Sequence, residues 1–209
     1  MKSTGNMKTL ELFSGTKSFS KVAKEFGHDT FTVDFDSSLE PDLCCSIFDY
    51  KDRPKVDVLW ASPPCQGFSV AVIGRNWNHD KTPKTDSARN AMLMVKETMK
   101  VIDEIQPTYW FIENPRGMLR KMEWLDAWVK QNGGVRHTVT YCQYGDTRMK
   151  PTDIWTNCLQ WKPRPICSNG SPCHISAPRG SRTGTQGLAN AKDRGVIPPE
   201  IFKEIFKSI

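Results

Sequence analysis

An apolar run passes directly into a proline-rich turn in VDVLWASPPCQG, residues 56–67. The run from Val56 to Ala61 is short and, apart from Asp57, apolar, which is typical of a strand buried on both faces of a sheet. The two prolines that follow stiffen the exit from this strand, and Gly67 permits a tight turn. Most cysteines are buried and inert, but this pattern predicts that Cys65 lies at the carboxyl edge of a sheet, where a thiol can act as a nucleophile.

Strand-like and helix-like segments alternate on both sides of this run. Strands are expected at residues 9–13, 30–34, 109–113, 137–142 and 153–156, and helices at 19–26 and 91–105. Such alternation predicts an open α/β domain of the Rossmann kind, with a mostly parallel sheet and helices on both faces. Ligands of these sheets bind beyond the carboxyl ends of the strands. The chemistry of the chain is therefore expected at that edge.

The composition is that of an ordinary globular protein. The 209 residues, 38% hydrophobic and 25% charged, suffice for one domain with its own core. No apolar run is long enough to span a membrane, and residues 1–8 are too polar for a secretory signal, so we expect a cytoplasmic location. There the seven cysteines are expected to serve as a nucleophile, metal ligands or core residues rather than disulfides. The net charge of +6 weakly favours a polyanionic partner.

A second chemical motif, IENPRG at residues 112–117, follows the next expected strand. Because parallel strands end at the same edge of a sheet, Glu113 is expected beside Cys65. A glutamate in such a place is often only a helix cap or a surface group. When paired with a nucleophilic thiol, it becomes a candidate general acid.

Three motifs taken together resemble those of the DNA cytosine-C5 methyltransferase family, and the likeness is greatest to its small, phage-like members. They are Phe13-Ser14-Gly15, Pro63-Pro64-Cys65-Gln66 and Glu113-Asn114-Pro115, in this order and at roughly the family's spacing. The resemblance extends from about Leu10 to Asn157. Either of the last two motifs alone is weak, but on consecutive strand ends they are highly specific together.

The resemblance implies a covalent mechanism. Cys65 attacks C6 of cytosine so that C5 can accept a methyl group, and Glu113 bonds N3 and the exocyclic amine. Arg148, in a stretch that keeps only the cationic character of the family's Gln-x-Arg-x-Arg motif, stabilises the thiolate or the cytosine O2. Because C6 is inaccessible inside a stacked duplex, the target base must be flipped out of duplex DNA.

The resemblance also implies which residues approach the DNA. A polar, basic loop at residues 66–87 follows the nucleophile and is expected to act as a lid. The candidate DNA contacts in this loop are Gln66, Ser69, Arg75 and Lys81. The other candidates are Lys150, close to Arg148 in the sequence, and Arg179 and Arg182 in the last third of the chain.

The cofactor implied by the resemblance is S-adenosylmethionine, held across the ends of the first strands. Asp34 at the end of the second strand binds the ribose diol, and Phe35 stacks on adenine. Many members of the family have an aspartate where this chain has Ser46, so the backbone at Ile47 is an alternative contact for the adenine edge. The other residues assigned to the cofactor are Phe13, Ser14, Gly15, Thr16 and Pro64.

The last third of the chain differs from the rest. We expect a catalytic and cofactor-binding domain at residues 7–156, a small recognition-like segment at 157–187 rich in Cys, Arg and Gly, and a C-terminal helix within 188–209 that packs on the catalytic domain. A typical family member has a separate recognition domain of a hundred or so residues. Sequence selectivity is therefore expected to be short, relaxed or supplied by a partner protein.

Four candidate metal ligands lie in the recognition-like segment: Cys158, Cys167, Cys173 and His174. They predict either a structural zinc site or a set of unpaired thiols. The spacing is irregular, and adjacent residues do not easily ligate the same ion. Arg179 and Arg182 predict phosphate contacts, with a solvated loop as the alternative.

Two other functions are compatible with these motifs. One is an RNA cytosine-C5 methyltransferase of the same architecture. The other is a catalytically inactive DNA-binding or regulatory relative, although such a protein would not require both Cys65 and Glu113. A reductase is disfavoured because the first loop lacks the Gly-x-Gly-x-x-Gly turn that binds pyrophosphate.

Overall fold

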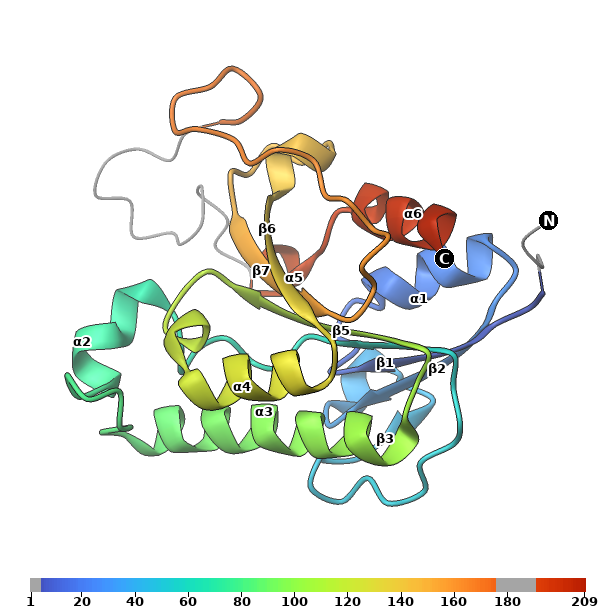
Figure 1. Cartoon of the computed structure of the whole chain (residues 1–209), viewed down its shortest axis with the longest axis horizontal. Helices are drawn as coiled ribbons and strands as arrows, with labels where there is room; N and C mark the ends of the chain where they lie inside the picture. The colour runs from blue at the N-terminus through green and yellow to red at the C-terminus, as the bar shows by residue number, and fades with distance from the viewer. Residues whose placement is uncertain (1–4, 176–190) are drawn as a thin grey trace.

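The computed structural model describes residues 5–175 and 191–209, so the expected phosphate contacts Arg179 and Arg182 lie outside the described residues. Its centre is a seven-stranded sheet in the order β3-β2-β1-β4-β5-β7-β6 (Figure 1). The five strands from β3 to β5 run parallel, whereas β7 is antiparallel to both β5 and β6. The sheet is therefore mostly parallel, as predicted. The strands are β1 (Lys8–Leu12), β2 (Asp29–Asp34), β3 (Leu43–Cys44), β4 (Val58–Ala61), β5 (Tyr109–Pro115), β6 (Val135–Thr140) and β7 (Pro151–Thr156).

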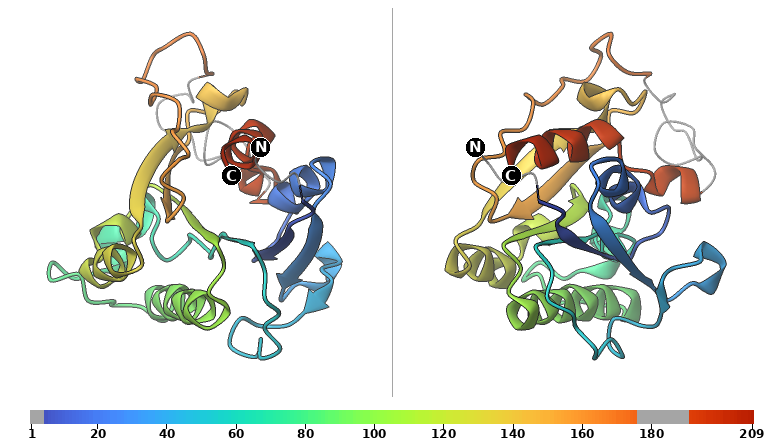
Figure 2. Two further views of the ribbon diagram at one scale, coloured as in Figure 1. Left: turned by 45° about the vertical axis from the view of Figure 1, so that its right-hand side comes forward. Right: turned by 90° about the vertical axis from the view of Figure 1, so that its right-hand side faces the viewer.

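Helices cover both faces of this sheet (Figure 2). Helices α1 and α6 lie on one face and α3 and α4 on the other, which confirms the predicted α/β architecture. None of the described helices is long and apolar enough to cross a membrane. The helices are α1 (Ser18–Glu25), α2 (Ile73–Asn76), α3 (Asp86–Ile105), α4 (Glu123–Gln131), α5 (Ala191–Gly195) and α6 (Pro199–Ser208).

Strand β4 shows why residues 58–61 are continuously apolar. Val58 and Trp60 belong to the core beneath α1 and α6, whereas Leu59 and Ala61 belong to the core beneath α3 and α4. All four side chains are fully buried. A central strand of a sheet covered on both faces has no polar side, so the usual alternation of apolar and polar residues disappears.

Helix α4 has no counterpart among the expected elements. Its buried side chains, Leu125, Trp128 and Val129, follow the i, i+3, i+4 spacing of a helix that packs on one side. Trp128 contacts Trp110 of β5 with ring centroids 4.9 Å apart, and its indole N–H donates to Asp103 of α3 at 3.0 Å. The periodicity is present in the sequence, but over only nine residues it is a weak signal.

The C-terminal helix α6 packs against α1. Pro199 occupies its first turn, where a proline removes no needed hydrogen bond. Phe202 stands edge-on to Phe19 of α1 and to Trp60 of β4, at centroid distances of 5.6 and 4.8 Å. This helix therefore completes the hydrophobic core on that face of the sheet.

Gly67, just beyond the cysteine of the proline-rich turn, is required for a reason other than the predicted one. Its φ is not left-handed, so the turn itself does not demand glycine. Instead α3 approaches its backbone closely: a Cβ at this position would lie 2.5 Å from the Cβ of Ala91 and 2.9 Å from the carbonyl oxygen of Ser87. The absence of a side chain lets the turn seat against the start of α3.

Gly67→Ala is therefore expected to lower the free energy of unfolding by about 1–3 kcal/mol, the usual penalty for overpacking. The matched control is Gly74→Ala in α2, where an added Cβ meets nothing within 4 Å. Urea denaturation of both variants measures the difference. Equal midpoints for the two would show that the turn can move away from α3 freely.

Candidate active site at the carboxyl edge of the sheet

Cys65 follows β4, and Glu113 lies near the end of the neighbouring parallel strand β5. Ala61, the last residue of β4, pairs with Ile112 of β5, so Glu113 and the turn after β4 lie at the same edge of the sheet. Glu113 itself still pairs with Ile154 of β7. Glu113 is only 5% exposed, and Cys65 is half-buried in the turn after β4. The two groups are close enough for the charge of Glu113 to raise the pKa of the Cys65 thiol. The fold thus brings together the two groups that the sequence predicted to be neighbours.

Asn114 holds the turn that carries the cysteine. This fully buried side chain donates through Nδ2 to the carbonyl oxygen of Pro63 at 2.9 Å, and the backbone N–H of Phe68 donates to the carbonyl of Cys65 at 3.0 Å. The N–H of Ser62 donates to the carbonyl of Leu12 at 3.3 Å, which ties the same turn to β1. The Glu-Asn motif therefore places a carboxyl in the site and also holds the turn that carries Cys65.

Burial is the main reason that the pKa of the Cys65 thiol lies above its ordinary value. The positive charges of Lys150 and Arg194 lower this pKa, and the negative charge of Glu113 raises it, but they do not cancel the effect of burial. A thiol in this environment is mostly protonated at neutral pH. It is therefore protected in the free protein and depends on nearby cations when it ionises.

The pKa of the Glu113 carboxyl is also raised, again because of burial. Lys150 and hydrogen bonds from Ser62 and Tyr141 act in the opposite direction. The Tyr141 hydroxyl donates to Oε1 at 3.2 Å, and the indole N–H of Trp60 donates to the Ser62 hydroxyl at 2.9 Å. A carboxyl that keeps its proton at a higher pH is suited to donate that proton to a ring nitrogen.

Arg148 does not lie where it was predicted to act. Its guanidinium is buried and bound to Asp146, with Nε 2.9 Å from each carboxylate oxygen. The remaining donors reach the carbonyl oxygens of Asp193 at 3.1 Å, Arg194 at 3.2 Å and Val196 at 2.8 Å. With these donors engaged, Arg148 anchors residues 193–196 near the site instead of contacting the thiol.

Lys150, predicted as a DNA contact, occupies the cationic position in this site. Its charge lowers the pKa of both Cys65 and Glu113. Nζ donates to the carbonyl oxygen of Arg194 at 3.0 Å and lies 4.9 Å from the ring centroid of Tyr141. Lys150 therefore has the electrostatic effect on the site that the sequence led us to expect of Arg148, whereas Arg148 is a buried anchor.

A cavity of about 240 Å³ lies beside this site, at the carboxyl ends of β1, β2 and β3. Phe35 is 72% exposed at its rim, whereas Asp34 is buried at the end of β2. Predicted cofactor residues that line the cavity are Phe13, Asp34, Phe35, Ser46, Ile47 and Pro64. The lining residues that sequence reasoning missed are Leu12, Val33, Cys45, Phe48 and Met94.

The loop between β1 and α1 contains the other three predicted cofactor residues, Ser14, Gly15 and Thr16. The backbone is left-handed at Phe13, Gly15 and Lys17, with φ of 55°, 48° and 56°. The N–H of Gly15 donates to Oδ2 of Asp34 at 2.9 Å, so the loop is tied to the end of β2. Ser14 Oγ is buried and has no partner among the described residues. A buried hydroxyl without a partner next to a cavity is a candidate ligand contact.

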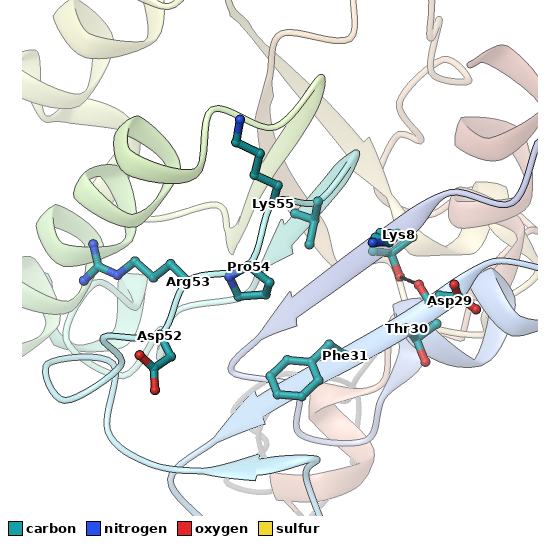
Figure 3. Close-up of a pocket in the computed structure, with 10 residues that line it drawn as sticks. Lys8, Asp29, Thr30, Phe31, Asp52, Arg53, Pro54 and Lys55 are labelled. Carbon is teal, nitrogen blue, oxygen red and sulfur yellow. Dashed lines mark hydrogen bonds between the residues drawn. The ribbon is translucent and has the colours of Figure 1, made fainter.

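A larger hollow of about 720 Å³ lies at the opposite edge of the sheet. Figure 3 shows that its residues come from the amino ends of β1 and β2 on one side and from the chain before β4 on the other. None of the predicted site residues lines it. Because ligands of such sheets bind beyond the carboxyl ends of the strands, we take the smaller cavity as the cofactor site.

The segment after the nucleophile, expected as a loop and lid, is partly helical and is anchored in the core. Phe68 and Trp77 are buried and stacked with ring centroids 5.5 Å apart, and the Trp77 indole N–H donates to the Gly67 carbonyl at 2.8 Å. The exposed residues of the segment are Gln66, several positions between these anchors, including Arg75 of α2, and most of residues 78–84. Of the predicted DNA contacts, Gln66 and Arg75 are exposed, Ser69 is half-buried, and Lys81 forms an ion pair with Glu123.

Cys158 does not join the other predicted metal ligands. It is buried in the core beneath α1 and α6, with its sulfur 3.9 Å from the hydroxyl of Ser208. Cys142 takes its place beside Cys167, Cys173 and His174. The prediction of Cys158 as a ligand was therefore wrong, because β7 runs antiparallel to β6 and carries this residue to the opposite end of the two strands from Cys142.

Solved structures of two other proteins share this architecture. A prophage-encoded protein of E. coli, described as a DNA modification methyltransferase, matches with a TM-score of 0.52 at 17% identity and covers 82% of this chain. A mutant of Spodoptera frugiperda DNMT2 matches with a TM-score of 0.51 at 21% identity and covers 79%. This chain spans 57% of each of these structures. The fold is thus that of a Rossmann-like methyltransferase.

Sequence comparisons narrow this class to a family. The profile of C-5 cytosine-specific DNA methylases matches residues 7–132. The protein named Probable DNA (cytosine-5)-methyltransferase of Frog virus 3 (isolate Goorha) is 31% identical over 95% of this chain and 98% of its own length. The type II methyltransferase M1.HphI of Haemophilus parahaemolyticus is 30% identical over 50% of this chain and 31% of its own. The chain belongs to the C-5 cytosine-specific DNA methylase family.

Proposed function

We propose that this chain transfers a methyl group from S-adenosylmethionine to C5 of cytosine in DNA, through a covalent adduct between Cys65 and a flipped-out base. The observation that carries the proposal is the thiol–carboxyl pair on neighbouring strand ends, with Lys150 acting on both groups. Membership of the family supports the reaction, since relatives in it are named for cytosine-5 methylation of DNA.

The residues around the smaller cavity fit S-adenosylmethionine. Apolar side chains and the exposed ring of Phe35 suit adenine, and the carboxylate of Asp34 suits a ribose diol. The buried hydroxyl of Ser14 lacks a partner that a polar ligand atom would provide. When bound, S-adenosylmethionine supplies an electrophilic methyl group. Pro64 lines the cavity and immediately precedes Cys65, so one turn joins the cofactor site to the nucleophile.

Cys65 and Glu113 act together on the cytosine ring. The Cys65 thiolate forms a bond to C6, and the electron pair displaced from the C5–C6 double bond is stabilised when Glu113 donates a proton to N3. C5 is then nucleophilic enough to take the methyl group. Loss of the C5 proton to solvent water, departure of the thiolate and return of the N3 proton to Glu113 restore the aromatic ring and the free enzyme. Lys150 stabilises the thiolate at the start and the end of this sequence.

The exposed residues of the segment 66–84, which follows the nucleophile, form the surface that we assign to duplex DNA. Gln66 and Arg75 are solvent-exposed there, a short distance along the chain from Cys65. A half-buried thiol is out of reach of a stacked base, so the target base must enter the site. With only a short segment at 157–187 in the place of a recognition domain, we expect a recognition site of a few base pairs or selectivity supplied by a partner protein.

Substitutions in the cavity test the cofactor assignment. Phe35→Ala removes an aromatic stack and Asp34→Asn removes a charged hydrogen-bond acceptor. Such contacts are each worth about 1–3 kcal/mol, so each change should weaken S-adenosylmethionine binding by roughly ten- to hundredfold. Calorimetry measures this, with Leu159→Ala as the control, an exposed apolar residue outside the cavity. Unchanged affinity in both variants would place the cofactor elsewhere.

The pH dependence of Cys65 labelling tests the role of Lys150. Because the charge of Lys150 lowers the pKa of this thiol, Lys150→Met should raise that pKa further. The thiolate is the reactive form, so labelling by iodoacetamide should slow at neutral pH, and its rise should move to higher pH. Mass spectrometry quantifies Cys65 against the exposed Cys44 in the same sample. Lys162→Met, an exposed change, is the control, and an identical effect there would contradict the assignment.

A direct assay separates the proposed substrate from its alternatives. The purified chain is incubated with labelled S-adenosylmethionine and either duplex DNA or tRNA, and DNA from a methylation-free host expressing it is sequenced after bisulfite treatment. We expect 5-methylcytosine in DNA. Transfer only to tRNA would replace DNA by RNA as the substrate. Binding of cofactor without transfer to either would indicate an inactive relative.

A further inference from the structure

A cluster of sulfur and nitrogen ligands lies outside the active site. Cys142, Cys167, Cys173 and His174 place one ligand atom each within 4.8 Å of the others. Cys142 belongs to the turn Tyr141–Tyr144 directly after β6, and the other three come from the segment after β7. Figure 1 shows that segment, in orange, passing beside this turn. Residues some 25 positions apart in the sequence thus converge on one point.

We propose that these four side chains bind a zinc ion that fixes the segment after β7 to the catalytic domain. The distances fit this ion: the Cys167 sulfur lies 3.2 Å from the Cys173 sulfur and 3.4 Å from Nδ1 of His174, and the Cys173 sulfur lies 3.7 Å from the same nitrogen. Around a tetrahedral zinc with Zn–S of about 2.3 Å and Zn–N of about 2.0–2.1 Å, neighbouring ligand atoms are roughly 3.5–3.8 Å apart.

The nature of the ligands selects the metal. Three thiols and one imidazole suit zinc, because soft sulfur ligands disfavour magnesium and calcium. Four protein ligands complete a tetrahedron and leave no open position, which is typical of a structural site. Binding deprotonates the three thiols and leaves the imidazole neutral, so three protons are released for each divalent ion.

The surroundings of the cluster hold its ligands in place. The backbone N–H of Cys167 donates to the hydroxyl of Thr140 at 2.9 Å, and the side-chain amide of Gln143 lies 3.5 Å from the Cys173 sulfur. The N–H of Ile175 donates to the carbonyl of Thr147 at 2.9 Å, directly after the histidine. Contacts of this kind orient metal ligands in other proteins.

The described part of the segment after β7, residues 157–175, lacks secondary structure that could order it. Residues 157–175 contain neither helix nor strand, and Leu159, Ile166 and Ile175 are 50–67% exposed. Trp161 is buried in the core beneath α1 and α6, but the chain after it buries few apolar side chains, so residues 162–175 depend on another source of order, which a structural metal supplies in small modules. Cys142 is next to Tyr141, the partner of Glu113, so the metal would join this segment to the edge of the active site.

Metal content and cobalt spectroscopy of the full chain test the site. Protein purified under reducing conditions should contain about one zinc ion per chain, as measured by inductively coupled plasma mass spectrometry. After exchange, Co²⁺ should give the intense visible absorption and the thiolate charge-transfer band of a tetrahedral sulfur site. Cys142→Ser and Cys173→Ser should each lose both signals. Cys158→Ala and the exposed Cys44→Ser should keep them, although they remove as many thiols.

Wild-type protein provides a readout that does not depend on the folding of any variant. Removal of zinc by a chelator should lower the melting temperature and expose the bonds after Leu159 and Trp161 to chymotrypsin, and added zinc should reverse both effects. Absence of metal in the purified chain, together with a Co²⁺ titration that gives no thiolate band, would overturn the proposal. Loss of the signals in Cys158→Ala with retention in Cys142→Ser would overturn the choice of ligands.

Discussion

Cys65→Ala is expected to abolish methyl transfer, by roughly 10⁴-fold or more, because without the sulfur no covalent bond to C6 can form. The fold should be unaffected. Cys65 is half-buried in a turn held by backbone hydrogen bonds and by Asn114, none of which involves the sulfur. Its removal should therefore change the free energy of unfolding by about 1 kcal/mol or less. Affinity for S-adenosylmethionine should stay near that of the wild type.

A radiolabelled methyl-transfer assay measures the loss, and thermal unfolding measures the fold. Cys44→Ala is the matched control, since this exposed thiol lies at the end of β3 and outside the thiol–carboxyl pair. DNA that contains 5-fluorocytosine at the target should trap a covalent adduct on the wild type and on Cys44→Ala but not on Cys65→Ala. Methyl transfer by Cys65→Ala at an appreciable fraction of the wild-type rate would exclude the covalent mechanism.

Cys65 and Glu113, whose substitutions are expected to have the largest effects on activity, could be predicted from the sequence because their positions depend on local patterns. Each follows a short apolar run, and parallel strands of a doubly covered sheet end at one edge. The order of the first strands follows from the same rules. The antiparallel insertion of β7 between β5 and β6 does not, because it depends on pairing between strands and leaves no periodicity of its own.

The different roles of Arg148 and Lys150 show where local patterns fail. The two residues are both cationic and two positions apart, so the sequence offers no basis for choosing between them. The choice depends on Asp146, which binds the arginine, and on carbonyl groups at residues 193–196, more than forty positions further along the chain. The presence of Cys142 in place of the expected Cys158 in the sulfur cluster also depends on contacts between distant residues. It follows from the end of the antiparallel pair β6 and β7 at which each cysteine lies.

Glu113→Gln should lower kcat by about 10²–10⁴-fold, the usual contribution of a positioned general acid. The amide keeps the size of the side chain and can still accept the hydrogen bond from the Tyr141 hydroxyl. It cannot donate an acidic proton to N3, so the loss falls on the transition state, and KM for DNA should change much less than kcat.

The free energy of unfolding provides the first control. The folded-state pKa of Glu113 is raised, so ionisation of this group opposes folding, and its contribution to stability declines as the pH rises from its unfolded pKa to its folded one. A neutral amide avoids that penalty, and the variant should be no less stable than the wild type above this range. Glu11→Gln is the matched change, because burial also raises the pKa of this carboxyl on β1, to about 7. Glu11 accepts from the N–H groups of Phe19 and Ser20 at the start of α1 and should leave kcat nearly unchanged.

The pH profile distinguishes an acid from a merely structural carboxyl. In the wild type, activity should rise with pH on the acid side and fall on the alkaline side, since the thiolate and the protonated carboxyl are the active forms and the fraction of enzyme that has both is largest between the two pKa values. Glu113→Gln has no proton to lose, so its residual activity should keep the rising limb and lack the falling one. If both limbs persist in the variant, the falling limb belongs to another group, and Glu113 only orients the base through hydrogen bonds.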